Sequence, residues 1–348
     1  MEHHVGIDVS LELSSVCVLD AAGKPVREAK VASEPEALVG YLRGLGVVIA
    51  RVGLEAGPLL QWLYDGLREA GYDVVLLETR HVKAALSAMA VKTDRRDARG
   101  IAQLLRMGWY RPVHRKSVPS QEIRALLGAR KQLQVKAMDL DLEQTLRGLL
   151  RGFGLKVGDV SRGKLPARVR ELTAGHAMLE RIVEPLLAAR EAIWREFARL
   201  RREVLAIVKE DQVCRRLMTC PGVGAVVSLT YKAAVDDPGR FKKSKAVGAF
   251  FGLTPKRYQS GETDIAGCIT RIGDAAVRSA LHDAANVLLT RETRFSTLKR
   301  WAVEVAKRRG MRRAKVALAR KLATVLHRIW VDGTEFRWGK DPAATAAA

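Results

Sequence analysis

The chain has 348 residues, of which 48% are hydrophobic and 28% are charged, and its formal net charge at pH 7 is +22. This length allows two or three domains with cores of their own, and no apolar run approaches the ~20 residues that a membrane helix needs. The composition therefore fits a globular protein and excludes one that is embedded in a membrane.

The positive charge is concentrated in the last two thirds of the chain. Residues 1–110 carry 13 Lys and Arg against 14 Asp and Glu, whereas residues 111–348 carry 47 against 24. Such a polycation suits the phosphate backbone of a nucleic acid, because each neutralised phosphate releases a counterion. An anionic membrane surface is the competing partner. Nucleic acid is favoured because the cationic helices also carry long apolar stripes suited to packing.

The N-terminal sequence and the cysteines indicate the cellular compartment. The N-terminus leads straight into an apolar strand without a signal pattern, so we expect a cytoplasmic protein. Cys17, Cys214, Cys220 and Cys268 lack paired C-x-x-C spacing, which indicates neither a zinc site nor a disulfide framework. They are expected to be reduced thiols.

The first hundred residues have the pattern of an α/β unit: a meander of three strands, then helix, strand, helix, strand and helix. The predicted strands cover residues 4–10, 14–20, 24–32, 47–56 and 72–79, and the predicted helices cover 33–46, 57–71 and about 81–108. Ser33 and Glu36 have the spacing of a capping box at the first helix. The order matches the ribonuclease-H-like arrangement.

Four acidic residues fall at particular points of this unit. Asp8 ends the first strand, Glu55 ends the fourth, and Asp94 and Asp97 lie three positions apart at the start of the last helix. Alone, an Asp-x-x-Asp pair flanked by arginines is most simply a solvated helix surface. In a ribonuclease-H-like sheet, however, the first and fourth strands are neighbours and the last helix crosses their ends. We therefore expect the four acids to converge.

Four converging carboxylates predict a metal site. They repel one another unless cations lie between them, and oxygen-only ligands favour Mg²⁺ or Mn²⁺. Two such ions stabilise both the entering and the leaving oxygen at a phosphodiester. The predicted substrate is thus a nucleic-acid backbone.

The middle of the chain reads as long helices after a basic, proline-bounded linker at residues 110–120. An apolar seam runs along the second half of this region and is broken only by Arg190. Its other members are Leu179, Val183, Leu186, Ile193, Phe197, Leu200, Val204 and Ile207. With a turn at residues 152–166, we expect an antiparallel coiled-coil hairpin that dimerises the protein or spaces its domains. Two ordinary packed helices are the alternative.

The third region contains a candidate helix–hairpin–helix. Gly222 and Gly224, in Pro-Gly-Val-Gly between two helical patterns, would let backbone N–H groups approach a DNA phosphate, although a generic turn uses the same glycines. Basic helices follow over residues 297–330 and are assigned to backbone contact. The candidate contact residues of this region are Arg312, Arg313 and Lys315, and, around the predicted polar loop after Pro255, Lys256, Arg257 and Arg271.

Motifs spread over nearly the whole chain resemble one family. GIDVS, GLEAG and KTDRRDA in the N-terminal part, and PGVG, RF-x-x-S-K and FFGLTP-x-x-x-QSG in the C-terminal part, are similar to those of the DEDD transposases of bacterial insertion sequences, the insertion sequence 110 family. These are bridge-RNA-guided DNA recombinases. Together with the patterns above, we expect four parts: a RuvC-like DEDD domain at 1–110, a linker and coiled-coil hairpin at 111–211, a mainly helical transposase domain at 212–340, and a disordered tail at 341–348.

The resemblance also implies roles. Asp8, Glu55, Asp94 and Asp97 would bind Mg²⁺ or Mn²⁺, and Ser260, otherwise an ordinary turn residue, would attack a DNA phosphodiester and form a transient phosphoserine link. The site would be composite across protomers of a dimer that pairs into a tetramer. The implied partners are donor DNA, target DNA and a structured bridge RNA, with no membrane, in the bacterial cytoplasm at the nucleoid.

One departure and three alternatives remain. Family members often carry a basic pair before Gly-Asp or Gly-Asn, where residues 270–274 (TRIGD) have one basic residue. The first alternative is a Holliday-junction-type nuclease that uses the metal-bound carboxylates with water as the nucleophile. The second is an actin-like ATPase, which GIDVS faintly echoes without the Asp-x-Gly-x-Thr form. The third is a non-catalytic nucleic-acid-binding protein.

Overall fold

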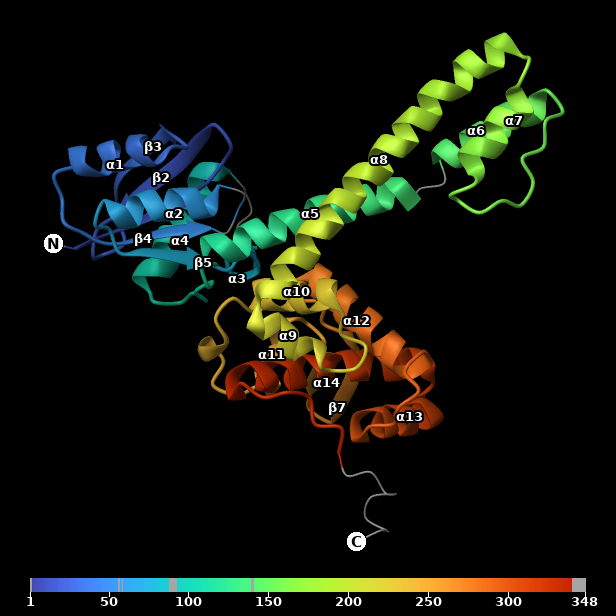
Figure 1. Cartoon of the computed structure of the whole chain (residues 1–348). Helices are drawn as coiled ribbons and strands as arrows, with labels where there is room; N and C mark the ends of the chain where they lie inside the picture. Colours follow the sequence, from blue (N-terminus) through green and yellow to red (C-terminus); the bar gives the residue numbers. More distant parts are fainter. Residues whose placement is uncertain (1, 56, 58, 88–92, 139–140, 340–348) are drawn as a thin grey trace, which may run out of the picture. The chain divides into compact units, whose positions relative to one another are not determined.

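The computed structural model describes residues 2–55, 57, 59–87, 93–138 and 141–339 (Figure 1). The chain divides into two compact units, Met1–Lys116 and Ser117–Ala348, named here the N-terminal unit and the C-terminal unit. Within the described ranges, no helix combines the length and the apolarity needed to cross a bilayer. The predicted tail at 341–348 lies outside the described residues.

The N-terminal unit is built on a five-stranded mixed sheet of order β3-β2-β1-β4-β5. Its strands are β1 (His3–Asp8), β2 (Leu13–Leu19), β3 (Pro25–Ala32), β4 (Ile49–Glu55) and β5 (Val74–Leu77). The first three strands pair antiparallel, β4 runs parallel to β1, and β5 runs parallel to β4. This is the ribonuclease-H-like topology, as predicted from the order of the elements.

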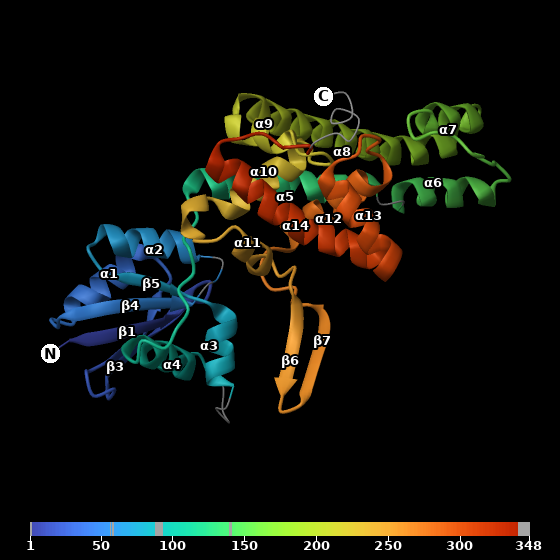
Figure 2. The ribbon, with the colours of Figure 1, turned by 90° about the horizontal axis from the view of Figure 1, so that it is seen from below.

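Helices cover both faces of this sheet (Figure 2). They are α1 (Pro35–Gly44), α2 (Leu60–Glu69), α3 (Thr79–Leu86) and α4 (Asp94–Arg106). Strand residues such as Val5 and Ile7 pack with the leucines of α1 and α2 on one face. On the other face, Cys17 and Leu19 meet Ala98 and Ala102 of α4. The alternation of side chains along each strand thus gives the sheet two separate apolar layers.

The predicted capping box at α1 is wrong. The N-cap residue of α1 is Glu34, and no side chain caps the helix. The Ser33 hydroxyl is buried and donates instead to the carbonyl oxygen of Ser10 at 2.7 Å, and it lies 2.8 Å from the Ser14 hydroxyl. The Ser33 hydroxyl therefore bonds to residues in and near β2 instead of capping α1.

The C-terminal unit begins with the long helices. These are α5 (Val118–Met138), α6 (Asp141–Gly152), α7 (Leu165–Thr173) and α8 (Ala177–Glu210). The second predicted arm is the single helix α8, which packs against α5 along one part and against α6 and α7 along another (Figure 1). The first predicted arm is α5 and α6, and the returning chain contains the additional short helix α7.

The buried side of α8 follows much of the predicted seam and includes two further residues. Its buried residues are Leu179, Val183, Leu187, Arg190, Val204 and Val208. Leu187 and Val208 are buried beside the predicted Leu186 and Ile207, which are partly buried and pack against the same apolar clusters. Arg190, the charged member, donates to Glu143 of α6 at 2.8 Å and to the carbonyl oxygen of Arg162 at 2.7 Å. The pair ties α6 and the following loop to α8.

The rest of the C-terminal unit is a helical body with one hairpin. Its elements are α9 (Gln212–Met218), α10 (Ala225–Val235), a 3₁₀ turn (Pro238–Arg240), α11 (Lys245–Phe250), β6 (Pro255–Ser260), β7 (Thr263–Ile269), α12 (Ala275–Thr290), α13 (Thr297–Arg309) and α14 (Met311–Asp332). Helix α14 runs through the core, where Leu318, Leu322 and Leu326 are fully buried. The Tyr231 hydroxyl of α10 donates to the carbonyl oxygen of Ala323 at 2.7 Å.

All four cysteines are free thiols, as expected. Burial raises the pKa of Cys17, Cys214 and Cys220 to about 12, and for Cys17 and Cys214 a neighbouring carboxylate adds to the rise. Cys268, on β7, is exposed.

Candidate active site

Asp8 and Glu55 leave the sheet side by side. They are the last residues of the adjacent parallel strands β1 and β4, and the register pairs Ile7 with Leu54. Gly6 and Gly53, two residues earlier in each strand, both face α4. Because side chains alternate along a strand, the two acids are directed to that same face. The prediction that these strands are neighbours is confirmed.

Helix α4 begins at the edge where these strands end. Its other end is tied to the β2–β3 turn: Gln103 Nε2 donates to the carbonyl oxygen of Gly23 at 2.8 Å, and Arg106 Nη1 donates to that of Ala21 at 3.2 Å. That turn lies near the start of β1, since His4 pairs with Leu19. The first turn of α4, with Asp94 and Asp97, is therefore at the edge of Asp8 and Glu55.

A close backbone contact sets the position of α4. A Cβ atom on Gly6 would lie 2.2 Å from the carbonyl oxygen of Ala98 and 2.4 Å from the amide nitrogen of Ala102. The helix can approach the strand so closely only because β1 has a glycine there and α4 has small residues. The N-cap residue Thr93 accepts a hydrogen bond from the Arg96 amide and defines where the helix begins.

One of the arginines beside the aspartates pairs with an acid of the sheet. Arg95 forms an ion pair with Glu28 of β3 through its guanidinium group. Asp94 is exposed and Asp97 is half-buried.

Four carboxylates together would give the all-oxygen donor set that Mg²⁺ and Mn²⁺ favour. Within the described ranges, however, no three Asp, Glu, His or Cys side chains are close enough to hold one ion. Residues 56, 58 and 88–92, next to Glu55 and Asp94, fall outside those ranges. The fold thus places the four acids at the same end of the sheet.

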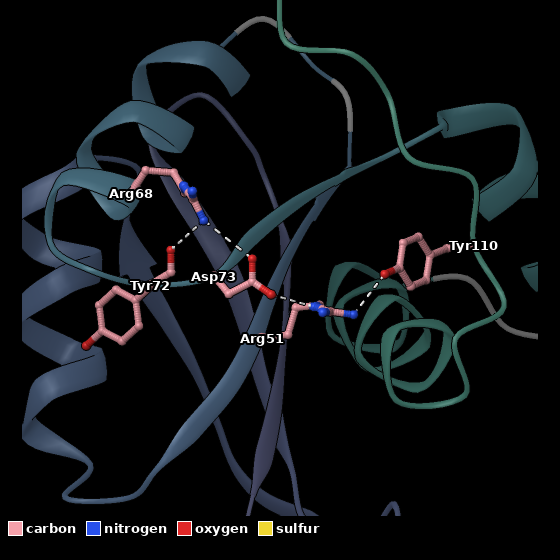
Figure 3. A network of polar contacts seen from close by, with 5 residues as sticks. All are labelled: Arg51, Arg68, Tyr72, Asp73 and Tyr110. Carbon is pink, nitrogen blue, oxygen red and sulfur yellow. Dashed lines mark hydrogen bonds and ion pairs between the residues drawn. The ribbon is translucent and has the colours of Figure 1, made fainter. Parts of the chain in front are cut away.

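Another acid of this unit has a structural role at the opposite edge. Asp73, which precedes β5, accepts from Arg51 Nε at 2.8 Å and from Arg68 Nη1 at 3.4 Å (Figure 3). Arg51 also donates to the Tyr110 hydroxyl at 3.0 Å. This network fastens the end of the unit to β4. Asp73 is therefore a suitable control for the candidate metal ligands.

Ser260 is the last residue of β6 and pairs with Thr263 across the two-residue turn Gly261–Glu262. Gly261 has φ +55°, and Glu262 is not among the described residues with positive φ, as in a type II′ hairpin turn. The prediction of a polar loop is wrong here, because the chain forms a β-hairpin. Every residue from Pro255 to Ser260 is exposed. Because β6 has no buried face, its sequence shows no alternation of apolar and polar residues that would mark a strand.

The two faces of the hairpin differ. Tyr258 pairs with Ile265, and both are largely exposed on the face of Ser260. On the other face, Arg257 makes a two-pronged ion pair with Asp264, with N–O distances of 2.8 and 2.7 Å. Figure 2 shows the hairpin extending away from the helices of its own unit.

The remaining predicted contact residues have distinct settings. Gly222 has φ +84°, and a Cβ atom on it would lie 2.3 Å from the carbonyl oxygen of Ala284 in α12. The glycine is thus explained by packing of the α9–α10 turn. Gly224 is the N-cap residue of α10 and faces open space. Arg312 and Arg313 are exposed in the first turn of α14, Lys315 is half-buried there, and Lys256 is exposed on β6.

A ribonuclease-H-like sheet with four acids at one edge, joined to a strongly cationic helical unit, defines a protein that processes nucleic acid. The model of the transposase IS116/IS110/IS902 family matches residues 214–300, and the model of the IS110 DEDD transposases, described as a transposase, matches residues 5–154. The chain belongs to the IS110 family of transposases, as its motifs predicted. Family membership favours this class over the ATPase.

Curated relatives share most of their length with this chain. The transposase for insertion sequence element IS1111A of Coxiella burnetii is 29% identical over 96% of this chain and 91% of that protein. A putative transposase of Sinorhizobium fredii is 26% identical over 98% and 87%, and a probable family 20 transposase of Pseudomonas aeruginosa is 28% identical over 83% and 86%.

Among solved structures, Thermus thermophilus RuvC is similar to part of the chain. RuvC in complex with Holliday junction substrate is 16% identical and covers 32% of this chain and 100% of its own, with a TM-score of 0.26. A second RuvC structure is 18% identical over 32% and 99%, with a TM-score of 0.25. The fold assignment rests on the strand order, not on this likeness.

Proposed function

We propose that this transposase cuts and rejoins DNA through a covalent serine–DNA intermediate, at a site made of Ser260 and the carboxylates of Asp8, Glu55, Asp94 and Asp97. The observation that carries the proposal is the convergence of two strand ends and the first turn of α4 on one sheet edge. Acids from three separate segments of the chain lie at that end of the sheet.

The exchange of bonds balances without a further reactant. The Ser260 oxygen forms a bond to phosphorus, its proton passes to a base or to water, and one strand leaves with a free hydroxyl. The bond energy stays in the phosphoserine diester, and a second DNA hydroxyl later attacks it and regenerates the serine. Mg²⁺ or Mn²⁺ held by the four carboxylates would supply positive charge at the phosphate. Lys256, on the hairpin that carries the serine, would hold the anionic strand.

The serine and the acids belong to different compact units. This supports the proposal that a site is completed between protomers, in a dimer that pairs into a tetramer around donor and target DNA. The excess of basic residues after residue 110 suits two nucleic acids at once, and we propose that a structured bridge RNA selects both DNA sequences. Such a protein would be associated with the bacterial nucleoid.

Metal binding tests the acid cluster directly. Asp97→Asn is expected to weaken Mn²⁺ binding at least ~10-fold and to abolish recombination. The amide carries no negative charge, so the proposed site would lose one of its four carboxylate ligands. Isothermal titration calorimetry on the pure protein measures the affinity. Asp73→Asn, which changes an acid of the Arg51 network, should bind Mn²⁺ as the wild type does. Equal affinities for wild type and Asp97→Asn would refute the assignment.

RNA guidance predicts what accompanies the protein. Sequencing of the RNA that co-purifies from cells carrying the whole element should recover one structured species, bound through contacts that weaken with salt. The same purification of a Ser260→Ala variant is the control, since loss of the nucleophile leaves the cationic surface unchanged. Recovery of random cellular RNA alone would contradict the guided mechanism.

A further inference from the structure

A cavity of about 230 Å³ lies at the root of the β6–β7 hairpin, between the start of α12 and the side of α14. Arg271, Arg278, Ser279, His282 and Asp283 provide its polar groups. Apolar side chains from the end of β7 and from α14 complete the lining. The cavity belongs to the C-terminal unit alone.

The backbone at Arg271 is unusual. Arg271 has φ +55°, and within the described ranges only Asp236 shares a positive φ among residues other than glycine. The Arg271 amide donates to the carbonyl oxygen of Gly252 at 3.1 Å. A Cβ atom on Gly252 would lie 2.1 Å from the carbonyl oxygen of Ile272, so the two segments touch backbone to backbone. Glycine would suit position 271 better, and an arginine held there indicates a role for its side chain.

Arg278 fixes the shape of this loop. Its Nη1 group donates to the carbonyl oxygens of Phe251, Ile272 and Gly273 at 3.2, 3.1 and 2.8 Å. The guanidinium group therefore braces residues 271–273 against the end of α11. Its positive charge remains at the cavity wall beside that of Arg271.

The opposite wall is the exposed side of α12. Ser279, His282 and Asp283 are three and four positions apart and share one face of the helix. Asp283 is the one acid of the cavity, and its carboxylate is 3.9 Å from His282 Nδ1 with 79% of the side chain exposed. Two arginines against one solvated carboxylate leave the cavity positive, with a hydroxyl and an imidazole as further hydrogen-bonding groups.

We propose that this cavity binds a backbone phosphate of the DNA strand on which Ser260 acts, a statement that rests on the proposed role of the serine. Arg271 would make the charge-assisted contact, because a guanidinium group matches the geometry of a phosphate. Ile269 pairs with Pro255, and Ser260 is five positions further along β6, a distance of roughly 17 Å. At 3.4 Å per nucleotide, the bound phosphate lies about five nucleotides from the reacting one.

Arg271→Gly separates binding from folding. Glycine accepts the left-handed backbone, so this variant should unfold at the same temperature as the wild type or at a higher one. Its affinity for a short cognate duplex is measured by fluorescence anisotropy from 50 to 300 mM salt. The slope of log affinity against log salt concentration should become shallower by about one unit. Arg195→Gln, which removes an exposed charge from α8, should keep the slope. Arg271→Asn, also tolerant of this backbone, provides a second variant.

All binding measurements use Ser260→Ala protein, so they do not depend on the chemistry of the serine. A methylphosphonate placed in the DNA about five nucleotides from the crossover should weaken binding by the protein that retains Arg271. The same modification should not change binding by the Arg271→Gly protein. An unchanged salt slope, a lowered unfolding temperature, or a loss confined to RNA probes would each overturn the proposal. Failure of Ser260 to form an adduct, with the slope change intact, would instead count against the proposed reaction alone.

Discussion

Ser260→Ala protein will form no covalent adduct with cognate DNA and no recombinant product, while it binds DNA as the wild type does. The alanine lacks the oxygen that must bond to phosphorus, so strand exchange should fall by at least ~10⁴-fold, as expected when a nucleophile is removed. Incubation with DNA, Mg²⁺ and the RNA, followed by a denaturing gel, measures the adduct directly.

Thr263→Ala is the matched control for this experiment. Thr263 lies opposite Ser260 across the hairpin and carries a hydroxyl on the same face, so its removal should leave the adduct intact. Cutting and joining at the wild-type rate by Ser260→Ala would show that the serine is not the nucleophile. Cutting without joining would favour the alternative, a nuclease that uses water.

Gly6→Ala will destabilise the N-terminal unit and displace α4. The added methyl group would lie 2.2 Å from the carbonyl oxygen of Ala98 and 2.4 Å from the amide nitrogen of Ala102, and backbone atoms on both sides leave no side chain that can turn away. We expect a loss of about 3 kcal/mol in the free energy of unfolding, together with loss of recombination, since Asp94 and Asp97 move with the helix.

Chemical denaturation followed by circular dichroism measures the effect, with Gly40→Ala as the control. Gly40 lies on the exposed side of α1 with nothing within 4 Å of an added Cβ atom. Alanine there should stabilise the helix by up to about 1 kcal/mol. Equal stability of Gly6→Ala and the wild type would mean that α4 does not dock as described.

The sheet and the position of its acids could be predicted from the sequence because burial leaves a direct pattern. Each strand is a short apolar run bounded by turns, and the order of strands and helices limits the possible topologies. Once β1 and β4 were neighbours, the placement of Asp8 and Glu55 at their ends followed. The role of Ser260 came instead from the resemblance of the surrounding motifs to the family.

Other features had no such pattern. The β6–β7 hairpin buries nothing until Ile269, so no apolar alternation marked it, although Gly261-Glu262 was an available turn signal. Ser33 has the spacing of a capping box, but its hydroxyl bonds to Ser10 and Ser14 instead. The full burial of Leu187 and Val208 on α8 depends on two different sets of packing partners. The left-handed backbone of Arg271 is a property of the folded loop, and the cavity beside it requires α12 and α14 to be in place.

The exposed hairpin has a consequence for how this enzyme can change. Substitutions along β6 and β7 remove almost no packing from the helical body, so their cost in folding is small. The segment that carries Ser260, the proposed nucleophile, can therefore be changed in length or in the residues of either face while the helical body stays intact. The hairpin can therefore vary in length and in substrate preference, whereas α4, which is in close backbone contact with β1, cannot.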